Sequence, residues 1–459
     1  MVMKTAWTKY TGKNLKALMN FSDDYKKFLD SSKTERESVK SSIALAKKAG
    51  FKDFNSINKI KAGDKIYFNN RGKSLALFVI GKKPIEDGMN ILGAHIDSPR
   101  VDVKQVPLYE DNGLVLLDTH YYGGIKKYQW VAHPMALHGV VCKKNGEVVD
   151  ICIGERDSDP VIEFSDLLIH LAQNQLEKPG AKVVEGEDLN ALIGSIPKNS
   201  KNKDTKDLVK NNILDILKNT YGIKEDDFVS AELEIVPAGK ARDLGLDKSM
   251  VMAYGQDDRI CAFTSLRAIL DMKTPNRTSV CILTDKEEIG SVGNTGAHSV
   301  FFENCVAELI NLQDDYSDLK VRHALENSAM LSSDVSAAFD PNYPQVNEPK
   351  NSAYFGKGIV FNKYTGSRGK SGSNDAHAEY LAKIRKIMDD NKISFQTSEL
   401  GKVDQGGGGT IAYVLANNNM DVLDAGIAVQ NMHACYETSS KVDIYEGYLA
   451  YKAFLKDMK

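Results

Sequence analysis

Short apolar runs bounded by polar turns constrain this chain more than any other feature. They are SLALFVIG (residues 74–81), GMNILGAHID (88–97), TSVCILTD (278–285), AMLSSD (329–334) and DVLDAGIA (421–428). Runs of this length and composition are typical of strands buried on both faces of a sheet. We therefore expect these segments to form neighbouring strands of one covered sheet.

Amphipathic stretches lie between these runs. DDRICAFTSLRAIL (257–270) and NDAHAEYLAKIRKIM (374–388) repeat their apolar residues at helical spacing, and Ser373 or Asn374 is suited to cap the second helix. Alternating strands and helices predict an α/β fold with a largely parallel central sheet covered on both faces. In such sheets, functional sites form at the carboxyl ends of the strands.

The middle of the chain, residues 106–244, has a different composition. VVCKKNGEVVDICIG (140–154) predicts a β-hairpin that turns at Asn145 and Gly146, and a polar run follows with little to bury. LVKNNILDILKNTYGI (208–223) predicts an amphipathic helix packed against its own domain. Since the α/β pattern resumes only at MVMAYGQDDR, we expect one domain from residues 1–105 and 245–459, interrupted by a second from 106–244.

Composition excludes several classes of protein. The 59 Lys and Arg residues nearly balance the 62 Asp and Glu residues in a chain of 459, which argues against a nucleic-acid partner. The six cysteines are widely spaced and form no CxxC pair, so buried free thiols are expected. Charges interrupt every apolar stretch of the first 29 residues, which favours a soluble cytoplasmic protein without a membrane partner.

Candidate metal ligands follow the predicted strands or open the next helix. They are His95 and Asp97, Asp257 and Asp258, Glu287 and Glu288, Asp334, and His433. Each residue alone is as readily a turn or cap residue, but all would emerge at one edge of the sheet. So many carboxylates in one crevice would repel one another without cations. The set suits two divalent ions such as Zn²⁺, with one carboxylate bridging them.

Two pairs of neighbouring residues add detail to this site. Asp97 lies two residues after His95, so its carboxylate can orient the local geometry without binding metal. Glu287 and Glu288 must point in different directions on a strand end or a turn. One of them can therefore bind metal while the other faces the reacting water.

These motifs resemble those of the M18 metalloaminopeptidases, which include the aspartyl aminopeptidases and belong to a clan of dizinc peptidases. The motifs are GAHIDSPR (93–100), YGQDDR (254–259), DKEEIGS (285–291), SSDVSAA (332–338) and NMHACYE (431–437). They span nearly the whole chain in order. The resemblance implies a zinc-peptidase-like α/β catalytic domain with a mixed, mostly parallel sheet flanked by helices, and an inserted, mostly β dimerisation domain.

The same resemblance assigns roles to individual residues. It implies that Asp257 bridges two metal ions, that His95 and Asp334 bind one ion and Glu288 and His433 the other, that Glu287 is the general base, and that Asp97 orients the His95 imidazole. His170, in LLIHLAQ, is implied to reach a neighbouring subunit's active site. A core or interface histidine on an amphipathic segment is the alternative for His170.

Substrate-binding segments depart from the eukaryotic pattern of that family. TGSRGKSGSND (365–375) has Lys370 near the position of the family's arginine, so a preference for acidic N-terminal residues does not follow, and a bacterial branch is the closer match. DQGGGGTIAYVL (404–415), which includes Gly408, is implied to line the substrate cleft. The alternative for this loop is a flexible turn beside the metal centre.

The resulting expectation is an aminopeptidase that releases N-terminal amino acids from peptides. A hydroxide shared by two divalent ions, zinc or alternatively cobalt or manganese, would attack the peptide carbonyl with Glu287 as general base. The resemblance also implies a homo-oligomer in which dimers assemble into a dodecamer. The alternatives are a carboxypeptidase or N-deacylase of the same clan and a non-catalytic assembly protein with this fold.

Overall fold

The computed structural model describes residues 4–199 and 206–459, which divide into two compact units. Unit 1 comprises Met1–Ser98, Ala241–Met432 and Glu437–Lys459, and unit 2 comprises Pro99–Lys240 and His433–Tyr436. The sequence placed the domain boundaries at 105/106 and 244/245. Strand β5 (Arg100–Asp111) runs without a break across the first of these positions.

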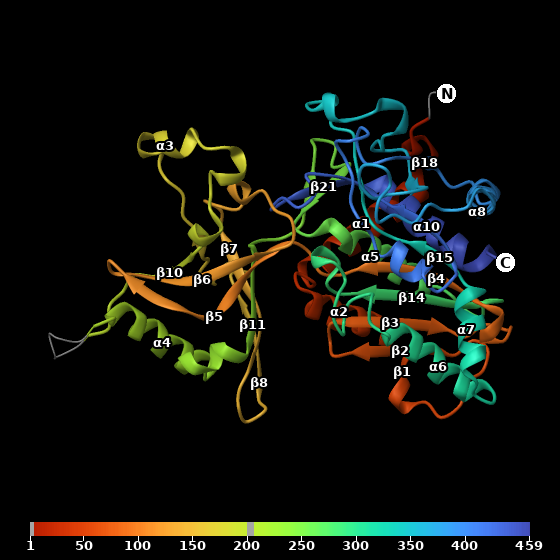
Figure 1. Cartoon of the computed structure of the whole chain (residues 1–459), viewed down its shortest axis with the longest axis horizontal. Helices are drawn as coiled ribbons and strands as arrows, with labels where there is room; N and C mark the ends of the chain where they lie inside the picture. The colour runs from red at the N-terminus through yellow and green to blue at the C-terminus, as the bar shows by residue number, and fades with distance from the viewer. Residues whose placement is uncertain (1–3, 200–205) are drawn as a thin grey trace. The chain divides into compact units, whose positions relative to one another are not determined.

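Unit 1 is built on a nine-stranded sheet (Figure 1). In spatial order its strands are β1 (Lys52–Asp53), β2 (Lys65–Asn70), β3 (Ser74–Val79), β14 (Thr278–Thr284), β4 (Met89–His95), β15 (Ala329–Ser332), β19 (Asp421–Gly426), β17 (Ile359–Asn362) and β18 (Phe395–Thr397). The central strands β14, β4, β15 and β19 are parallel, whereas β3 and β17 pair with this group in antiparallel orientation. The predicted mixed, mostly parallel sheet is confirmed.

Helices cover both faces of this sheet, and its strands β3, β14, β4 and β15 are buried along their whole length. Along β3, Leu75, Leu77 and Val79 join one hydrophobic cluster while Ala76 and Phe78 join another. The first cluster includes residues of α1 (Gly12–Asp30), α2 (Glu35–Lys48), α5 (Gln256–Leu270), α8 (Ala378–Asp390) and α10 (Lys441–Asp457). The second includes residues of α6 (Phe301–Gln313), α7 (Asp318–Glu326) and α9 (Ala412–Ala416).

One predicted helix start was wrong. Helix α8 begins at Ala378 with His377 at the N-cap position, and neither Ser373 nor Asn374 caps it. The Ser373 hydroxyl instead accepts a hydrogen bond from the Thr365 amide, and the Asn374 side chain donates to the Val422 carbonyl. Both side chains anchor the preceding loop, so they are not available to the helix.

A smaller five-stranded sheet completes unit 1. Its order is β12 (Arg242–Leu244), β13 (Met250–Ala253), β21 (Glu437–Ser440), β20 (Ala428–Gln430) and β16 (Ser336–Ala337). Strand β13 leads directly into α5, and β21 leads into α10. The sheet therefore connects the segments that carry Asp257 and Glu437.

Unit 2 is mostly β, as the resemblance implied. Its seven-stranded sheet has the order β8 (Val148–Ile153), β7 (Met135–Cys142), β11 (Ala231–Pro237), β5, β6 (Leu114–Tyr122), β10 (Ala191–Gly194) and β9 (Glu163–Phe164). Strands β7 and β8 form the predicted hairpin around Asn145 and Gly146. Among the described residues of this unit, the α-helices are α3 (Gln173–Leu176) and α4 (Leu208–Tyr221).

The expectations for cysteine and for membrane segments concern the described residues. All six cysteines lie among them and are free thiols, as predicted, but Cys152 is exposed and Cys142 only partly buried, so the expected burial is wrong for these two. None of the helices in residues 4–199 and 206–459 combines the length and the apolar character needed to cross a membrane.

Candidate metal centre

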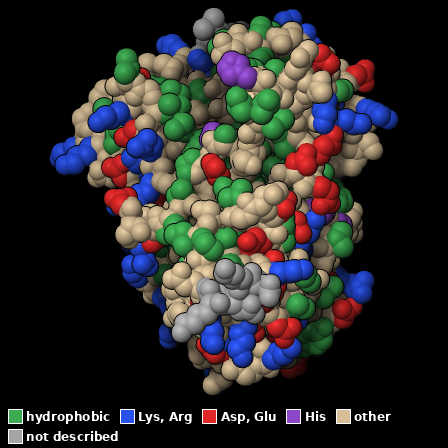
Figure 2. Space-filling view, turned by 90° about the vertical axis from the view of Figure 1, so that its left-hand side faces the viewer, with side chains coloured by type: hydrophobic (Ala, Val, Ile, Leu, Met, Phe, Trp, Pro, Cys, Tyr) green, Lys and Arg blue, Asp and Glu red, His purple; other side chains and the backbone are tan. Residues whose placement is uncertain are grey.

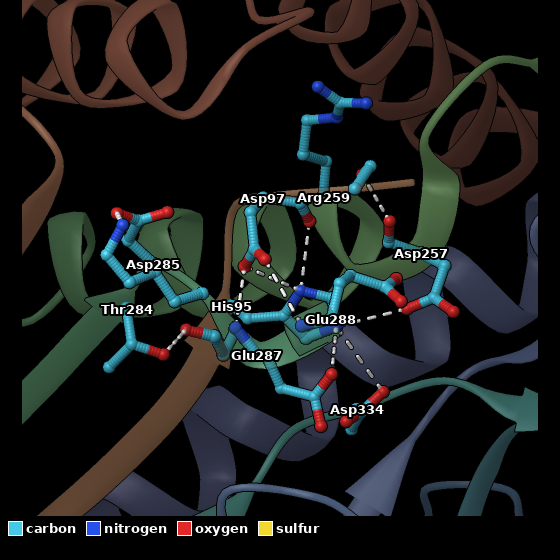
Figure 3. Close-up of polar contacts among 12 residues, drawn as sticks. His95, Asp97, Asp257, Arg259, Thr284, Asp285, Glu287, Glu288 and Asp334 are labelled. Carbon is cyan, nitrogen blue, oxygen red and sulfur yellow. Dashed lines mark hydrogen bonds and ion pairs between the residues drawn. The ribbon is translucent and has the colours of Figure 1, made fainter. Parts of the chain in front are cut away.

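Three parallel strands bring the candidate ligands of unit 1 to one edge of the sheet. His95 ends β4, Asp334 follows the end of β15 by two residues, and Glu287 and Glu288 lie in a 3₁₀ turn (Glu287–Ile289) after β14. Because β14, β4 and β15 are parallel neighbours, their carboxyl ends meet there. Figure 3 shows these side chains pointing toward one another.

The His95 imidazole lies at the centre of this cluster and is buried. Its Nε2 atom is 3.1 Å from Asp257 Oδ1, 3.8 Å from Asp334 Oδ1 and 4.0 Å from Glu287 Oε2. Its Nδ1 atom lies 3.0 Å from the main-chain oxygen of Asp97. An N–H at Nδ1 that donates to this carbonyl leaves the Nε2 lone pair directed at the carboxylates, which is the tautomer a metal-binding histidine needs.

Asp257 is held in place by hydrogen bonds between its main chain and neighbouring side chains. Gly255, the N-cap residue of α5, has φ of +67°, and a Cβ atom there would collide with the Arg259 guanidinium. The Asp257 amide donates to Glu437 Oε2 at 3.0 Å, and the Ser98 hydroxyl donates to the Asp257 carbonyl. The Asp257–Asp258 peptide bond is cis. These contacts fix the direction in which the Asp257 carboxylate leaves the helix start.

Asp97 binds the turn that carries the two glutamates. Its carboxylate accepts hydrogen bonds from the amides of Glu287 at 3.1 Å and Glu288 at 3.2 Å. The same carboxylate lies 3.4 Å from His95 Nδ1, while the Asp97 carbonyl is the nearer partner of that atom. Asp97 therefore positions both sides of the cluster, whereas the sequence indicated only the His95 side.

Burial and charge shift the pKa values of the cluster strongly. Burial lowers the pKa of His95, but hydrogen bonds with Asp257 and Asp97 and the charges of Asp334 and Glu287 hold that pKa well above its ordinary value. Burial also raises the pKa of Asp334 well above its usual range; His95 opposes this rise, and nearby acidic residues reinforce it. A positive charge at this position would relieve both effects.

The donor atoms of unit 1 suit divalent metal ions. Ligand atoms of His95, Asp257 and Asp334 lie within 4.8 Å of one another, and so do those of His95, Glu287 and Glu288. Imidazole nitrogen and carboxylate oxygen are ligands that Zn²⁺ accepts in catalytic sites. The residues present therefore fit the metal centre that the sequence predicts.

The other predicted site residues are His433, His170, Lys370 and Gly408. His433 belongs to a four-residue segment of unit 2, where its Nδ1 lies 2.7 Å from the Gly124 carbonyl oxygen. His170 is exposed in a 3₁₀ turn of unit 2. Lys370 is exposed in unit 1 and binds Asp375 at 3.0 Å, and the Gly408 carbonyl accepts from the Gly366 amide at 2.6 Å. The roles of these four residues stay predictions.

Supporting residues were missed by the sequence analysis. Gln256 donates to the Glu437 carbonyl at 2.6 Å, and its Oε1 accepts from the hydroxyls of Tyr25 and Ser439. Gln256 therefore joins α1, β21 and the start of α5 behind Asp257. Their positions in the sequence could have indicated this role, because Gln256, Glu437 and Ser98 all lie inside the motifs that carry the candidate ligands.

Comparisons with known proteins agree with this geometry. A family model described as "Aminopeptidase I zinc metalloprotease (M18)" matches residues 28–455. A curated relative from Clostridium acetobutylicum, "Probable M18 family aminopeptidase 1", is 60% identical over 458 residues, covering 99% of this chain and 98% of the relative.

Solved structures give the same result. The M18 aminopeptidase of Thermotoga maritima superposes with a TM-score of 0.95 at 42% identity, covering all of both chains. The yeast mApe1 structure, described as a dodecamer, has a TM-score of 0.76 at 22% identity over 95% of this chain and 96% of its own. At that identity the yeast structure shows likeness of fold alone.

Proposed function

The chain belongs to the M18 family of zinc metalloproteases and is a metal-dependent aminopeptidase, and from this premise we propose how its residues hold metal and carry out hydrolysis. In this proposal each chain would hold two zinc ions: His95 and Asp334 would bind one ion, Glu288 and His433 would bind the other, and Asp257 would contribute to both. The observation that carries this assignment is the convergence of Asp257 and Asp334 on His95 Nε2.

The surroundings of the two histidines support their role as ligands. In each one the Nδ1 atom is within hydrogen-bond distance of a main-chain carbonyl, that of Asp97 for His95 and that of Gly124 for His433. A histidine that donates from Nδ1 presents its Nε2 lone pair, and such a hydrogen bond is the usual support of a metal-binding imidazole.

Glu287 is the general base in this proposal. When bound, the ions lower the pKa of water to about 7 and polarise the substrate carbonyl. Glu287 takes the proton of the attacking water and returns a proton to the leaving amide nitrogen. Its amide is fixed by the Asp97 carboxylate, while its side chain is 16% exposed and close to His95. Glu287 is thus both positioned and accessible to water and substrate.

Substrate selectivity is assigned to two loops of unit 1. The Lys370 ammonium lies 3.0 Å from an Asp375 oxygen and 3.7 Å from the centre of the Tyr364 ring. Because the Lys370 ammonium is exposed and already bound to Asp375, we propose that Lys370 does not impose a strong preference for acidic N-terminal residues. Gly408 would line the cleft through its main chain.

We further propose that the chain forms dimers that assemble into a dodecamer, as the yeast relative's structure is described. Exposed apolar side chains surround His170, among them Leu168, Ile169 and Leu171. Such a cluster is typical of a surface covered by another protein chain. In this arrangement His170 reaches a neighbouring active site, and light scattering in solution tests the assembly. The cytoplasmic location stays a prediction from composition.

Metal analysis of purified variants tests the ligand assignment. The wild-type protein should contain two zinc ions per chain after reconstitution, and Asp334→Ala and His433→Ala should each lose at least one. His323→Ala, which removes a histidine from α7 outside the site, is the matched control and should lose none. Full metal content in the His433→Ala protein would contradict the assignment of the second ion.

Activity assays test the reaction itself. Aminoacyl anilides with a free amine should be hydrolysed, and their N-acetylated forms should not, because an aminopeptidase recognises the free α-amine. A panel of neutral, basic and acidic anilides, measured with apoprotein reconstituted in Zn²⁺, Co²⁺ or Mn²⁺, would establish the preferred residue. Faster hydrolysis of the acidic anilides than of all others would contradict the proposal for Lys370.

A further inference from the structure

The sheet of unit 2 closes on itself around an apolar space. Ile162 directly precedes β9, and Met135 is the first residue of β7. These two residues exchange a pair of main-chain hydrogen bonds of 2.7 and 3.0 Å. This bridge joins the β9 end of the sheet to β7, which already pairs with β11. The strands from β7 round to β9 thus form a barrel-like wall. Their backbone groups hydrogen-bond to one another, and alternate side chains of each strand face the interior.

A cavity of about 420 Å³ lies between this wall and helix α4. Its lining is almost entirely aliphatic and comes from strands on several sides of the wall, including Leu117, Leu137, Ile151, Ile153 and Leu233. Helix α4 contributes Ile213, Ile216 and Leu217. The volume lies in the range of pockets that bind small molecules, about 300–1,000 Å³.

Helix α4 covers the cavity without filling it. The helix packs on β5, β6 and β10 of its own unit, as its sequence predicted, but of its fourteen residues only Val209 is buried. The apolar side chains of Val161, Ile196 and Ile216 are 55%, 72% and 49% exposed at the rim. Figure 2 looks onto unit 2 and shows hydrophobic side chains gathered on this face. The cavity is therefore open at its edge to a molecule from solution.

We propose that this cavity is a binding site for a neutral, apolar small molecule. A polypeptide segment would bring N–H and C=O groups into a space whose walls offer them almost no partners, at a cost of roughly 1–3 kcal/mol for each unpaired group. An aliphatic or aromatic molecule carries no such cost, and its transfer from water is favoured by the apolar area it buries.

Charge also favours a neutral occupant over an anionic one. Two lysines near α4 are paired with carboxylates: Lys198 lies 2.5 Å from Asp215, and Lys210 lies 2.6 Å from Glu225. Among the residues that line the cavity, all of which are described, the polar side chains belong to Ser195 and Asn212 and none is charged. A carboxylate or phosphate group would find no cation inside.

Fluorescence titration of the full-length protein with the neutral dye N-phenyl-1-naphthylamine tests this site. The dye should bind saturably with a rise in emission. Ile216→Trp on α4 and Ile153→Trp on β8 should each weaken binding about tenfold or more, because an indole occupies the space that the dye needs. Two variants on different elements guard against loss of folding in one of them.

The matched control is Lys218→Trp, which adds the same indole to an exposed position of α4 outside the cavity lining. It should bind the dye like the wild-type protein, and anilide hydrolysis should be unchanged in both α4 variants. Binding that is absent, or equal in the Ile216→Trp and Lys218→Trp proteins, would overturn the proposal. Binding only by dissociated single chains would also overturn it, since another copy of the chain would then fill the cavity.

Discussion

Helices α5 and α4 have nearly equal lengths but opposite relations to the sheets beside them. Every residue of α5 except Arg267 and Leu270 is buried, whereas α4 buries only Val209. Both segments show apolar residues at helical spacing in the sequence. Helical periodicity therefore predicts that a helix forms, but the amount of apolar surface brought by other segments decides how completely its face is covered.

This difference in burial matches the role proposed for the region beside each helix. Helix α5 lies between α1, α10 and the central sheet, and that packing holds the Asp257 end of the helix in a fixed position. Helix α4 makes few contacts with β5, β6 and β10, and it leaves an apolar cavity beneath it. A metal centre requires ligands held to within a fraction of an ångström, whereas a cavity for an apolar molecule tolerates looser walls.

Glu287→Gln gives the largest expected effect, and it tests whether the metal cluster of unit 1 carries the chemistry. The substitution removes the proposed proton acceptor but keeps the size of the side chain, so kcat should fall by about 10²–10⁴-fold. Metal content should stay near that of the wild-type protein, because Glu287 is not assigned as a ligand. Steady-state kinetics with an aminoacyl anilide and metal analysis of the same sample measure both.

Glu303→Gln is the control for this experiment, since it makes the same change at an exposed position of α6. Its kcat should equal that of the wild-type protein. Undiminished turnover in the Glu287→Gln protein would remove Glu287 from the mechanism. A loss of metal with the loss of turnover would instead make it a ligand.

Phe263→Ala should have the next largest effect and sharpens the comparison of the two helices. The Phe263 ring on α5 is 1% exposed and lies between 5.2 and 5.4 Å from the rings of Phe21, Tyr25 and Phe28 on α1. Truncation leaves a cavity among rigid neighbours and should cost about 3–5 kcal/mol of unfolding free energy. Urea unfolding of unit 1, followed by loss of anilide hydrolysis, would measure this cost.

The sequence predicted the central strands and the loops that carry His95, Glu287 and Asp334. This succeeded because a strand buried on both faces must be apolar throughout, so its end is marked by the first polar residue. The common position of these loops could also be predicted, because the carboxyl ends of neighbouring parallel strands lie at the same edge of a sheet. The hydrogen bonds of Asp97 to the Glu287 and Glu288 amides could not be predicted, because they depend on the curvature of a turn.

The sequence did not reveal the closed sheet of unit 2. Its closing bridge is a single residue pair, Met135 with Ile162, and Ile162 lies outside any regular strand. The periodicity of side chains that marks a longer strand is absent from so short a contact. The cavity under α4 depends on this closure, so it could not be inferred from the amphipathic pattern of the helix.

Ile216→Ala gives the smallest expected effect and completes the comparison. The side chain lies on α4, is 49% exposed and faces a cavity, so its removal leaves few broken contacts. The unfolding free energy should change by no more than about 0.5 kcal/mol, since surface substitutions away from packed features are generally this mild. Thermal unfolding of unit 2, followed by hydrogen exchange of amides in β6 and β11, measures the change. A cost near that of Phe263→Ala would show that α4 is packed as tightly as α5, and the cavity could then not admit a ligand without local unfolding.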